Sequence, residues 1–187
     1  MNAPHFTVFT DGSCGSQEGG DIGAWCAVVV SAAGRKVLYG CTYRTTTSRC
    51  ELTPIIESLR YIRSLATDSR GVRVRVISDS QYTIKTLAGE YPMHKNEDLW
   101  DGLEAVRKGL EVQYIWRSRN THDYMTYCDA VCSLLRHRTK VIVEELVGSW
   151  RDAGDLLQEV ELPQDTDVFK ELNNVGTQQR PAAGETV

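Results

Sequence analysis

The first 44 residues contain three consecutive strand-like segments, and this feature constrains the fold more than any other. The segments span residues 5–11, 22–31 and 34–44, and they are rich in β-branched and aromatic residues. A glycine-rich loop follows Asp11, which ends the first segment, and a short turn at residues 32–34 joins the second pair. Connections this short favour antiparallel neighbours, so we expect a three-stranded antiparallel meander.

The chain then alternates between helical and extended patterns. Apolar spacing predicts helices over 48–65, 81–88, 98–110 and 123–138, and further strands over 72–77 and 112–116. Strands that follow helical crossovers join a sheet in parallel. We therefore predict an α/β fold with a mixed five-stranded sheet, in which a three-strand antiparallel meander and two parallel strands are flanked by helices.

The end of the chain differs from this body in charge. Residues 1–140 hold 18 Lys and Arg against 15 Asp and Glu, whereas residues 141–187 hold 3 against 10. We expect one domain over 1–140, an additional helix over 141–163 that packs on or extends it, and a flexible acidic and polar tail over 164–187. Residues 141–187 are our candidate for binding a protein partner, and we expect a monomer otherwise.

The sequence favours a cytoplasmic protein that does not enter a membrane. No apolar run approaches the ~20 residues that a membrane-spanning helix needs. The first residues lack the basic and apolar regions of a secretion signal, and the six cysteines form no CxxC pair. Reduced thiols are the expected state of these cysteines.

Four carboxylates lie at notable places in this pattern, and each has an ordinary structural explanation. Asp11 at a strand end suits a turn, and Asp79 between a strand and a helix suits a helix cap. Glu51 follows Ser48 in the S-x-x-E spacing of a capping box. Asp129 suits a solvated helix face.

Taken together, the same carboxylates predict a metal site. Asp11 and Asp79 end strands that we expect to be adjacent and parallel, so they would lie ~5 Å apart, and Glu51 would face the same edge. Clustered acids repel one another unless cations neutralise them. Such oxygen ligands suit Mg²⁺, with Mn²⁺ as the alternative. Two ions ~3.5–4 Å apart would activate water for phosphodiester hydrolysis.

Five segments between residues 6 and 138 resemble the motifs of type 1 ribonucleases H, in the same order. They are FTDGSCGSQEGGDIGAW, TTSRCEL, VISDSQY, KNEDLW and CDAVCSLLR. The resemblance implies a ribonuclease H-like fold and an endonuclease that hydrolyses the RNA strand of an RNA–DNA hybrid with two Mg²⁺ ions. It also implies that Asp11, Glu51, Asp79 and Asp129 are the catalytic, metal-binding carboxylates.

The sequence departs from the family pattern in two places. Where the family has a loop histidine that assists catalysis, this chain has Arg119, and the nearest histidine is His122. We take His122 as the catalytic candidate and Arg119 as its alternative. The stretch 87–99 is too short for the basic, Trp-containing handle of many bacterial members. Because phosphate contacts dominate affinity for nucleic acids, we expect weak, salt-sensitive binding of the hybrid.

Small polar groups near the acids are the candidate substrate contacts, and Trp100 and Trp116 are expected in the core or packed on the sheet rather than stacked on bases. The candidates could read the 2′-hydroxyls that distinguish RNA from DNA: Gly12, Ser13, Thr47, Ser48 and Arg49.

Two other functions remain open at this point: a DNA nuclease or resolvase of the same fold, and a non-catalytic interaction module. The segment TTSRCEL argues against the first, and the presence of all four acids argues against the second.

Overall fold

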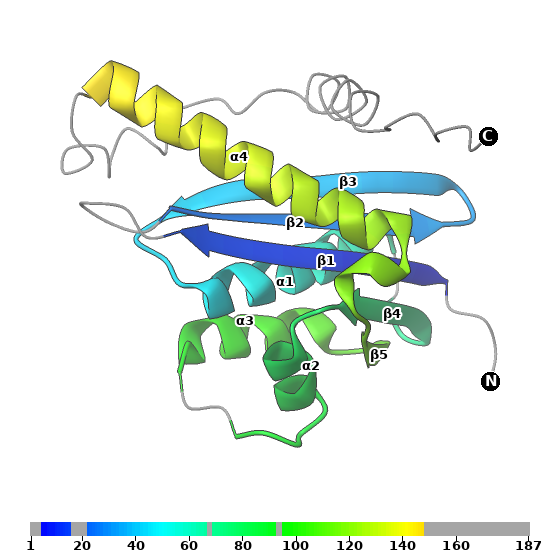
Figure 1. Ribbon diagram of the computed structural model, residues 1–187. Helices are drawn as coiled ribbons and strands as arrows, with labels where there is room; N and C mark the ends of the chain where they lie inside the picture. The colour runs from blue at the N-terminus through cyan, green and yellow to red at the C-terminus, as the bar shows by residue number, and fades with distance from the viewer. Residues whose placement is uncertain (1–4, 16–21, 67–68, 93–94, 148–187) are drawn as a thin grey trace, which may run out of the picture.

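The computed structural model describes residues 5–15, 22–66, 69–92 and 95–147 (Figure 1). Within them, five strands and four α-helices alternate much as the sequence predicts. The elements are β1 (Phe6–Gly15), β2 (Ile22–Ser31), β3 (Gly34–Tyr43), α1 (Thr47–Leu65), β4 (Val72–Ser78), α2 (Gln81–Leu87), α3 (Glu97–Arg107), β5 (Leu110–Trp116), a 3₁₀ turn (Arg119–Thr121) and α4 (Asp123–Val147).

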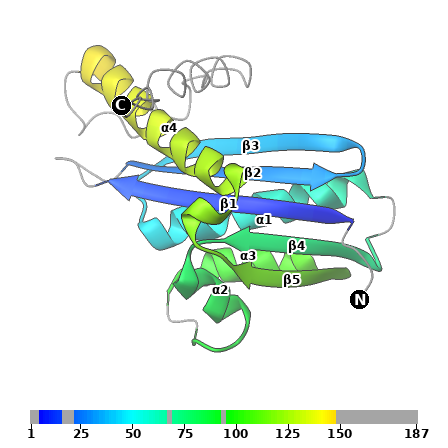
Figure 2. The ribbon, with the colours of Figure 1, turned by 45° about the vertical axis from the view of Figure 1, so that its right-hand side comes forward.

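The strands form one mixed sheet in the order β3-β2-β1-β4-β5, and Figure 2 shows them side by side. β1 pairs antiparallel with β2, and β2 pairs antiparallel with β3, which is the expected meander. β4 lies parallel to both β1 and β5. The predicted fold class is confirmed.

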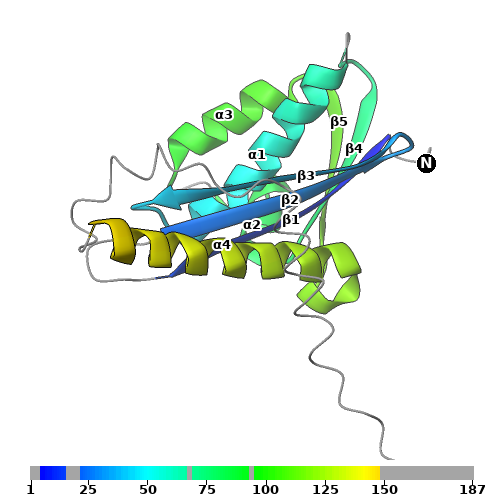
Figure 3. The same ribbon diagram turned by 90° about the horizontal axis from the view of Figure 1, so that it is seen from above.

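Helices cover the two faces of the sheet unequally. α1 and α3 pack on one face, and α4 crosses the other face over β1 and β2 (Figure 3). Alternating side chains of the central strands feed two separate cores. Val8 and Val76 point to the α1 side, whereas Phe9 and Val28 point to the α4 side. Because of this alternation, only every second side chain of β1 points to the face of the sheet that α4 covers.

β1 does not end at Asp11, as the sequence suggested, but continues through Gly15. The antiparallel ladder with β2 persists from Asp11, opposite Cys26, to Gly15, opposite Ile22. The parallel ladder with β4, in contrast, stops at Thr10, opposite Ser78. Asp11 therefore lies within β1, one residue beyond the point where β1 stops pairing with its parallel neighbour β4.

α4 also differs from the sequence-based prediction, because it runs past the expected helix end at 138 to Val147. Residues 139–147 contain neither Gly nor Pro, so no stop signal interrupts the helix. Residues 148–187 lie outside the described residues. The helix expected over 141–163, the tail over 164–187 and the domain boundary at 140 thus stay predictions.

Trp100 and Trp116 differ in their exposure to solvent. Trp100 is buried, as expected, whereas Trp116 is 43% exposed, so the core is excluded for Trp116 and packing on the sheet is the alternative left. Trp116 is the last residue of the edge strand β5, where the sheet ends. Among the described helices, none combines the length and apolar character that crossing a membrane would require.

Candidate metal-binding active site

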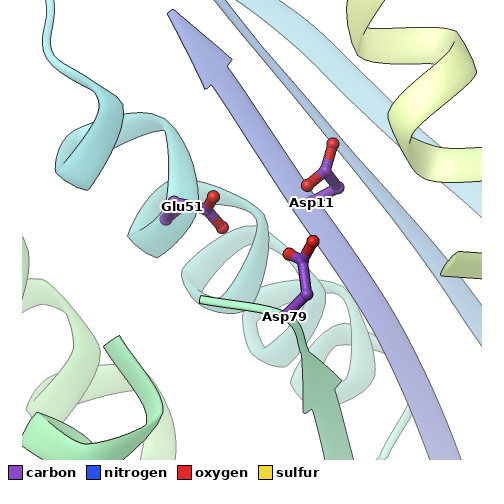
Figure 4. Close-up of side chains that lie close together, drawn as sticks. All are labelled: Asp11, Glu51 and Asp79. Carbon is purple, nitrogen blue, oxygen red and sulfur yellow. The ribbon is translucent and has the colours of Figure 1, made fainter. Parts of the chain in front are cut away.

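Three of the predicted carboxylates meet at one end of the sheet. Asp11 comes from β1, Asp79 directly follows β4, and Glu51 comes from the second turn of α1. One carboxylate oxygen from each lies within 4.8 Å of the others. Figure 4 shows the three side chains pointing toward a common space between the strand and the helix.

A close contact at Gly12 brings α1 up to β1. A Cβ atom at this position would lie 2.2 Å from the carbonyl carbon of Cys50 and 2.4 Å from the backbone nitrogen of Glu51. Because these neighbours are backbone atoms, any side chain here would push α1 away and move Glu51 from Asp11. Gly12 was predicted as a substrate contact; its visible role is this packing, and the substrate role stays a prediction.

The capping explanations for Glu51 and Asp79 are wrong. The N-cap of α1 is Thr46, whose hydroxyl accepts a hydrogen bond from the backbone N–H of Arg49. The N-cap of α2 is Ser80, whose hydroxyl accepts from the N–H of Thr83. Each helix is thus capped by a hydroxyl group of another residue, which leaves the carboxylates of Glu51 and Asp79 for the site.

Several carboxylate oxygens in this cluster are buried without a hydrogen-bond donor. They are both oxygens of Asp11, Oε2 of Glu51 and Oδ1 of Asp79. Burial, with added repulsion from Asp79, raises the pKa of Asp11 to about 7. Burial, with added repulsion from Asp11, raises the pKa of Glu51 to about 9. Hard oxygen ligands left unpaired in one small space fit a divalent cation such as Mg²⁺.

The fourth acid, Asp129, joins the cluster through Arg119. The Arg119 Nε atom lies 2.9 Å from Oδ2 of Asp79, and its Nη1 atom lies 2.7 Å from Oδ1 of Asp129. Its Nη2 atom lies 3.5 Å from Oδ1 of Asp11. Asp129 reaches this position because α4 packs against β1. The Cys132 thiol on α4 donates a hydrogen bond to the backbone carbonyl of Asp11 at 3.5 Å. The sequence indicated Arg119 as the residue at the histidine position, but not that it would span three carboxylates.

His122 lies beside the cluster rather than in it. Its ring stacks on Phe9 with 4.2 Å between ring centroids, and its Nδ1 atom accepts a hydrogen bond from the backbone N–H of Tyr124 at 3.1 Å. In the described part of the chain, it makes no ion pair with the four acids. A catalytic role for His122 stays a prediction.

The remaining substrate candidates surround the start of α1. Ser13 lies on β1, two residues beyond Asp11, and Thr47 and Ser48 form the first turn of α1. Arg49 is engaged in structure: its guanidinium binds both carboxylate oxygens of Asp98, at 2.9 and 2.6 Å. This pair ties the start of α3 to the start of α1.

Comparison with known proteins points to one family. The model of the RNase H family matches residues 3–118. A protein named ribonuclease H from Cupriavidus necator strain H16 is 31% identical over 141 residues, which cover 68% of this chain and 92% of that protein.

Solved structures show the same fold at lower identity. The N-terminal RNase H domain of a Mycobacterium tuberculosis protein, fused to maltose-binding protein, superposes with a TM-score of 0.55 at 20% identity. The match covers 71% of this chain and 94% of that one. LC11-RNase H1, in a crystal structure with an RNA/DNA hybrid, gives a TM-score of 0.53 at 15% identity, over 66% of this chain and 92% of that one.

Proposed function

The chain belongs to the ribonuclease H family, and on that premise we propose that it hydrolyses the RNA strand of RNA–DNA hybrids by a two-metal-ion mechanism. It is thus a ribonuclease H, a phosphodiester hydrolase, and the proposal concerns its substrate, its metal ions and its residues. The observation that carries the proposal is the group formed by Asp11, Glu51 and Asp79, whose buried oxygens lack hydrogen-bond donors.

Asp11, Glu51, Asp79 and Asp129 are the residues that would hold the metal ions. Bound divalent ions supply an activated water and stabilise the charge that develops on the scissile phosphate and the leaving oxygen. Oxygen ligands on a sheet and a packed helix hold their geometry better than ligands on a loop. Mg²⁺ is the proposed ion, because it suits a site of carboxylates that also receives a phosphate, and Mn²⁺ is the alternative.

The protein's own groups would bind and orient the hybrid around this cluster. Thr47 and Ser48 offer small donors and acceptors to 2′-hydroxyls, and Ser13 lies on the adjoining strand. Arg119, with a side chain 46% exposed, places a positive charge where a phosphate would approach. His122 is the alternative for this assisting role.

Exposed aromatic residues near α2 offer a second contact with the hybrid, in place of the basic, Trp-containing handle for which residues 87–99 are too short. Tyr82 and Tyr91 are both about two-fifths exposed, and their ring centroids lie 6.3 Å apart. The Lys85 Nζ atom lies 5.3 Å from the Tyr91 ring centroid. Aromatic faces beside a lysine suit stacking on a nucleic-acid strand together with a phosphate contact. Trp116, at the end of β5, is 43% exposed and donates its indole N–H to the Asp79 carbonyl at 3.0 Å, which places a third exposed aromatic residue beside the acid cluster.

The structure with a bound hybrid belongs to LC11-RNase H1, and its likeness in fold supports the same substrate class for this chain. Two other functions stay as alternatives, a DNA nuclease or resolvase of this fold and a non-catalytic module. The acid cluster, together with the family match over residues 3–118, favours hydrolysis of the hybrid over both alternatives.

An end-labelled cleavage assay tests the proposal against these alternatives. The wild-type protein is incubated with an RNA–DNA hybrid, a DNA duplex and a four-way DNA junction, with Mg²⁺ or with excess chelator. We expect Mg²⁺-dependent cuts in the RNA strand of the hybrid alone. Cutting of the junction would favour the resolvase, and a folded protein that cuts none of the three would favour the non-catalytic module.

A further inference from the structure

Arg119 contacts carboxylates from three different parts of the fold at once. Its guanidinium contacts Asp79 after β4, Asp129 on α4 and Asp11 on β1. A guanidinium stays protonated at any pH at which the protein folds, and its planar fork suits several carboxylates. Arg119 thus brings a permanent positive charge to a cluster of four acids.

The carboxylate oxygens that Arg119 binds and those that it leaves free fall into two sets. It hydrogen-bonds Oδ2 of Asp79 and Oδ1 of Asp129. The oxygens without a hydrogen-bond donor are both oxygens of Asp11, Oε2 of Glu51 and Oδ1 of Asp79; of these, Oδ1 of Asp11 lies 3.5 Å from Nη2 of Arg119. A cation bound by the donor-free oxygens of Glu51 and Asp79 would displace no hydrogen bond of Arg119, whereas a cation bound by Oδ2 of Asp79 and Oδ1 of Asp129 would compete with the guanidinium.

We propose that Arg119 is the resident counter-cation of this site and competes with divalent metal ions for Asp79 and Asp129. The inference rests on the proposed function, because it assumes that the cluster binds such ions. Full loading of the cluster then requires the guanidinium to leave Asp79 and Asp129.

The surroundings of Arg119 allow this movement. The residue lies on the 3₁₀ turn between β5 and α4, and its side chain is 46% exposed. Leaving the cluster would therefore expose no core side chain and would return a well-hydrated group to water. An exposed ion pair is worth little by itself, so a divalent cation can outcompete it.

The test is divalent-ion binding without nucleic acid, because this readout does not depend on activity. Titration calorimetry with Mn²⁺ compares the wild type, Arg119→Ala, Arg119→Lys and Arg117→Ala. Arg117 is the matched control, since it is exposed, lies two residues away and directs its Nη1 atom to the Trp116 carbonyl. Melting of each protein in metal-free buffer and in saturating Mn²⁺ is measured in parallel.

We expect Arg119→Ala to bind Mn²⁺ about tenfold more tightly than the wild type, because a like charge next to the ion is gone. Arg119→Lys should remain near the wild type, and Arg117→Ala should be unchanged. In metal-free buffer Arg119→Ala should melt at a lower temperature, and saturating Mn²⁺ should remove the deficit.

Two results would overturn the inference. If Arg119→Ala binds Mn²⁺ no more tightly than the wild type while the wild type cleaves the hybrid, Arg119 does not compete, and the proposed function stands. If neither protein binds Mn²⁺ and the wild type cleaves no hybrid, the inference and the proposed function fail together.

Discussion

The inner and outer halves of the site are built differently. The inner half consists of Asp11, Glu51 and Asp79, carried by β1, α1 and the end of β4 within the packed body. The outer half consists of Arg119, His122 and Asp129, on the turn after β5 and the start of α4, with the Asp129 side chain 34% exposed. The family match covers residues 3–118 and therefore includes the inner half alone.

This difference indicates where the geometry is rigid and where it adapts. Two buried carboxylates and a third that is 13% exposed repel one another in this space, so only firm packing keeps them together in a metal-free protein. That packing comes from β1, β4 and α1, which share one core. The outer ion pairs of Arg119 are exposed, and their geometry is held far less tightly.

The largest expected effect comes from removing one carboxylate charge in each half. Asp79→Asn should lower turnover on the hybrid at least ~10³-fold, because it removes a buried ligand from the proposed metal site. Asp129→Asn should lower turnover less, by ~10–10²-fold, because its side chain is more exposed than that of Asp79 and its charge is better screened by water. Rates at saturating hybrid and Mg²⁺ would measure both effects.

Melting of the same variants separates lost chemistry from lost folding. In metal-free buffer Asp79→Asn should melt at or above the wild-type temperature, since it relieves repulsion within the cluster. An Asp79→Asn protein with wild-type turnover would remove Asp79 from the site. A loss at Asp129 as large as that at Asp79 would break the distinction between the two halves.

The sequence predicts the inner half well because its signals are local. Strand alternation and helical spacing fix where β1, β4 and α1 lie, and the parallel pairing then brings Asp11 and Asp79 to neighbouring positions. What the sequence did not show is the contact at Gly12, since a close approach of two backbones leaves no pattern in one sequence. The glycine suggested a turn and a contact with substrate, but not a contact with α1.

The outer half was less predictable because the positions of Arg119 and His122 depend on the conformation of the loop between β5 and α4. The sequence identified Arg119 and His122 as alternatives by spacing, but spacing does not reveal which side chain turns inward. In the structure, stacking on Phe9 holds His122 aside while Arg119 points to the acids. The exposure of Trp116 escaped prediction for a similar reason, because a strand end looks apolar whether or not a helix covers it.

The next largest effect should come from the packing that supports the inner half. Gly12→Ala should lower the free energy of unfolding by ~2–4 kcal/mol, because the added Cβ would overlap the backbone of Cys50 and Glu51. Gly102→Ala on α3 is the matched control. Nothing lies within 4 Å of its added Cβ, so it should stabilise the helix by ~0.5–1 kcal/mol.

Urea unfolding of the two glycine variants would measure these changes. The Gly12→Ala protein that does fold should also bind Mn²⁺ more weakly, since Glu51 moves away from Asp11. A Gly12→Ala protein as stable as the wild type would mean that α1 adapts to the side chain at little cost. The inner half would then be no more rigid than the outer half.

A smaller effect should appear in the pH dependence of stability without metal ions. The pKa of Asp11 is raised to about 7 and that of Glu51 to about 9, while both lie near ~4 in the unfolded chain. Between those values the folded protein binds more protons than the unfolded one, so stability falls as pH rises from ~4 toward 9. Tm in metal-free buffer should decline across this window.

Two comparisons assign this decline to the inner half. Glu51→Gln should flatten the upper part of the window, above pH 7, because the glutamine carries no charge at any pH. Saturating Mg²⁺ should also reduce the decline, since a bound cation stabilises the ionised carboxylates. A Tm profile that is the same for the wild type and Glu51→Gln would show that Glu51 does not carry a buried charge.

The smallest expected effect concerns His122 in the outer half. Since its ring stacks on Phe9 and makes no ion pair with the acids in the described residues, His122→Ala should lower turnover by less than about tenfold. The lost stacking should cost ~0.5–1.5 kcal/mol of stability. His122→Phe keeps an aromatic ring without a titratable nitrogen, so it should restore most of both losses.

General acid–base catalysis by His122 would give another pattern: a fall in turnover of ~10²-fold or more, equal in the Ala and Phe variants. That outcome would mean that the loop moves His122 into the site when the hybrid binds, and that the outer half is the adaptable part of a single catalytic unit.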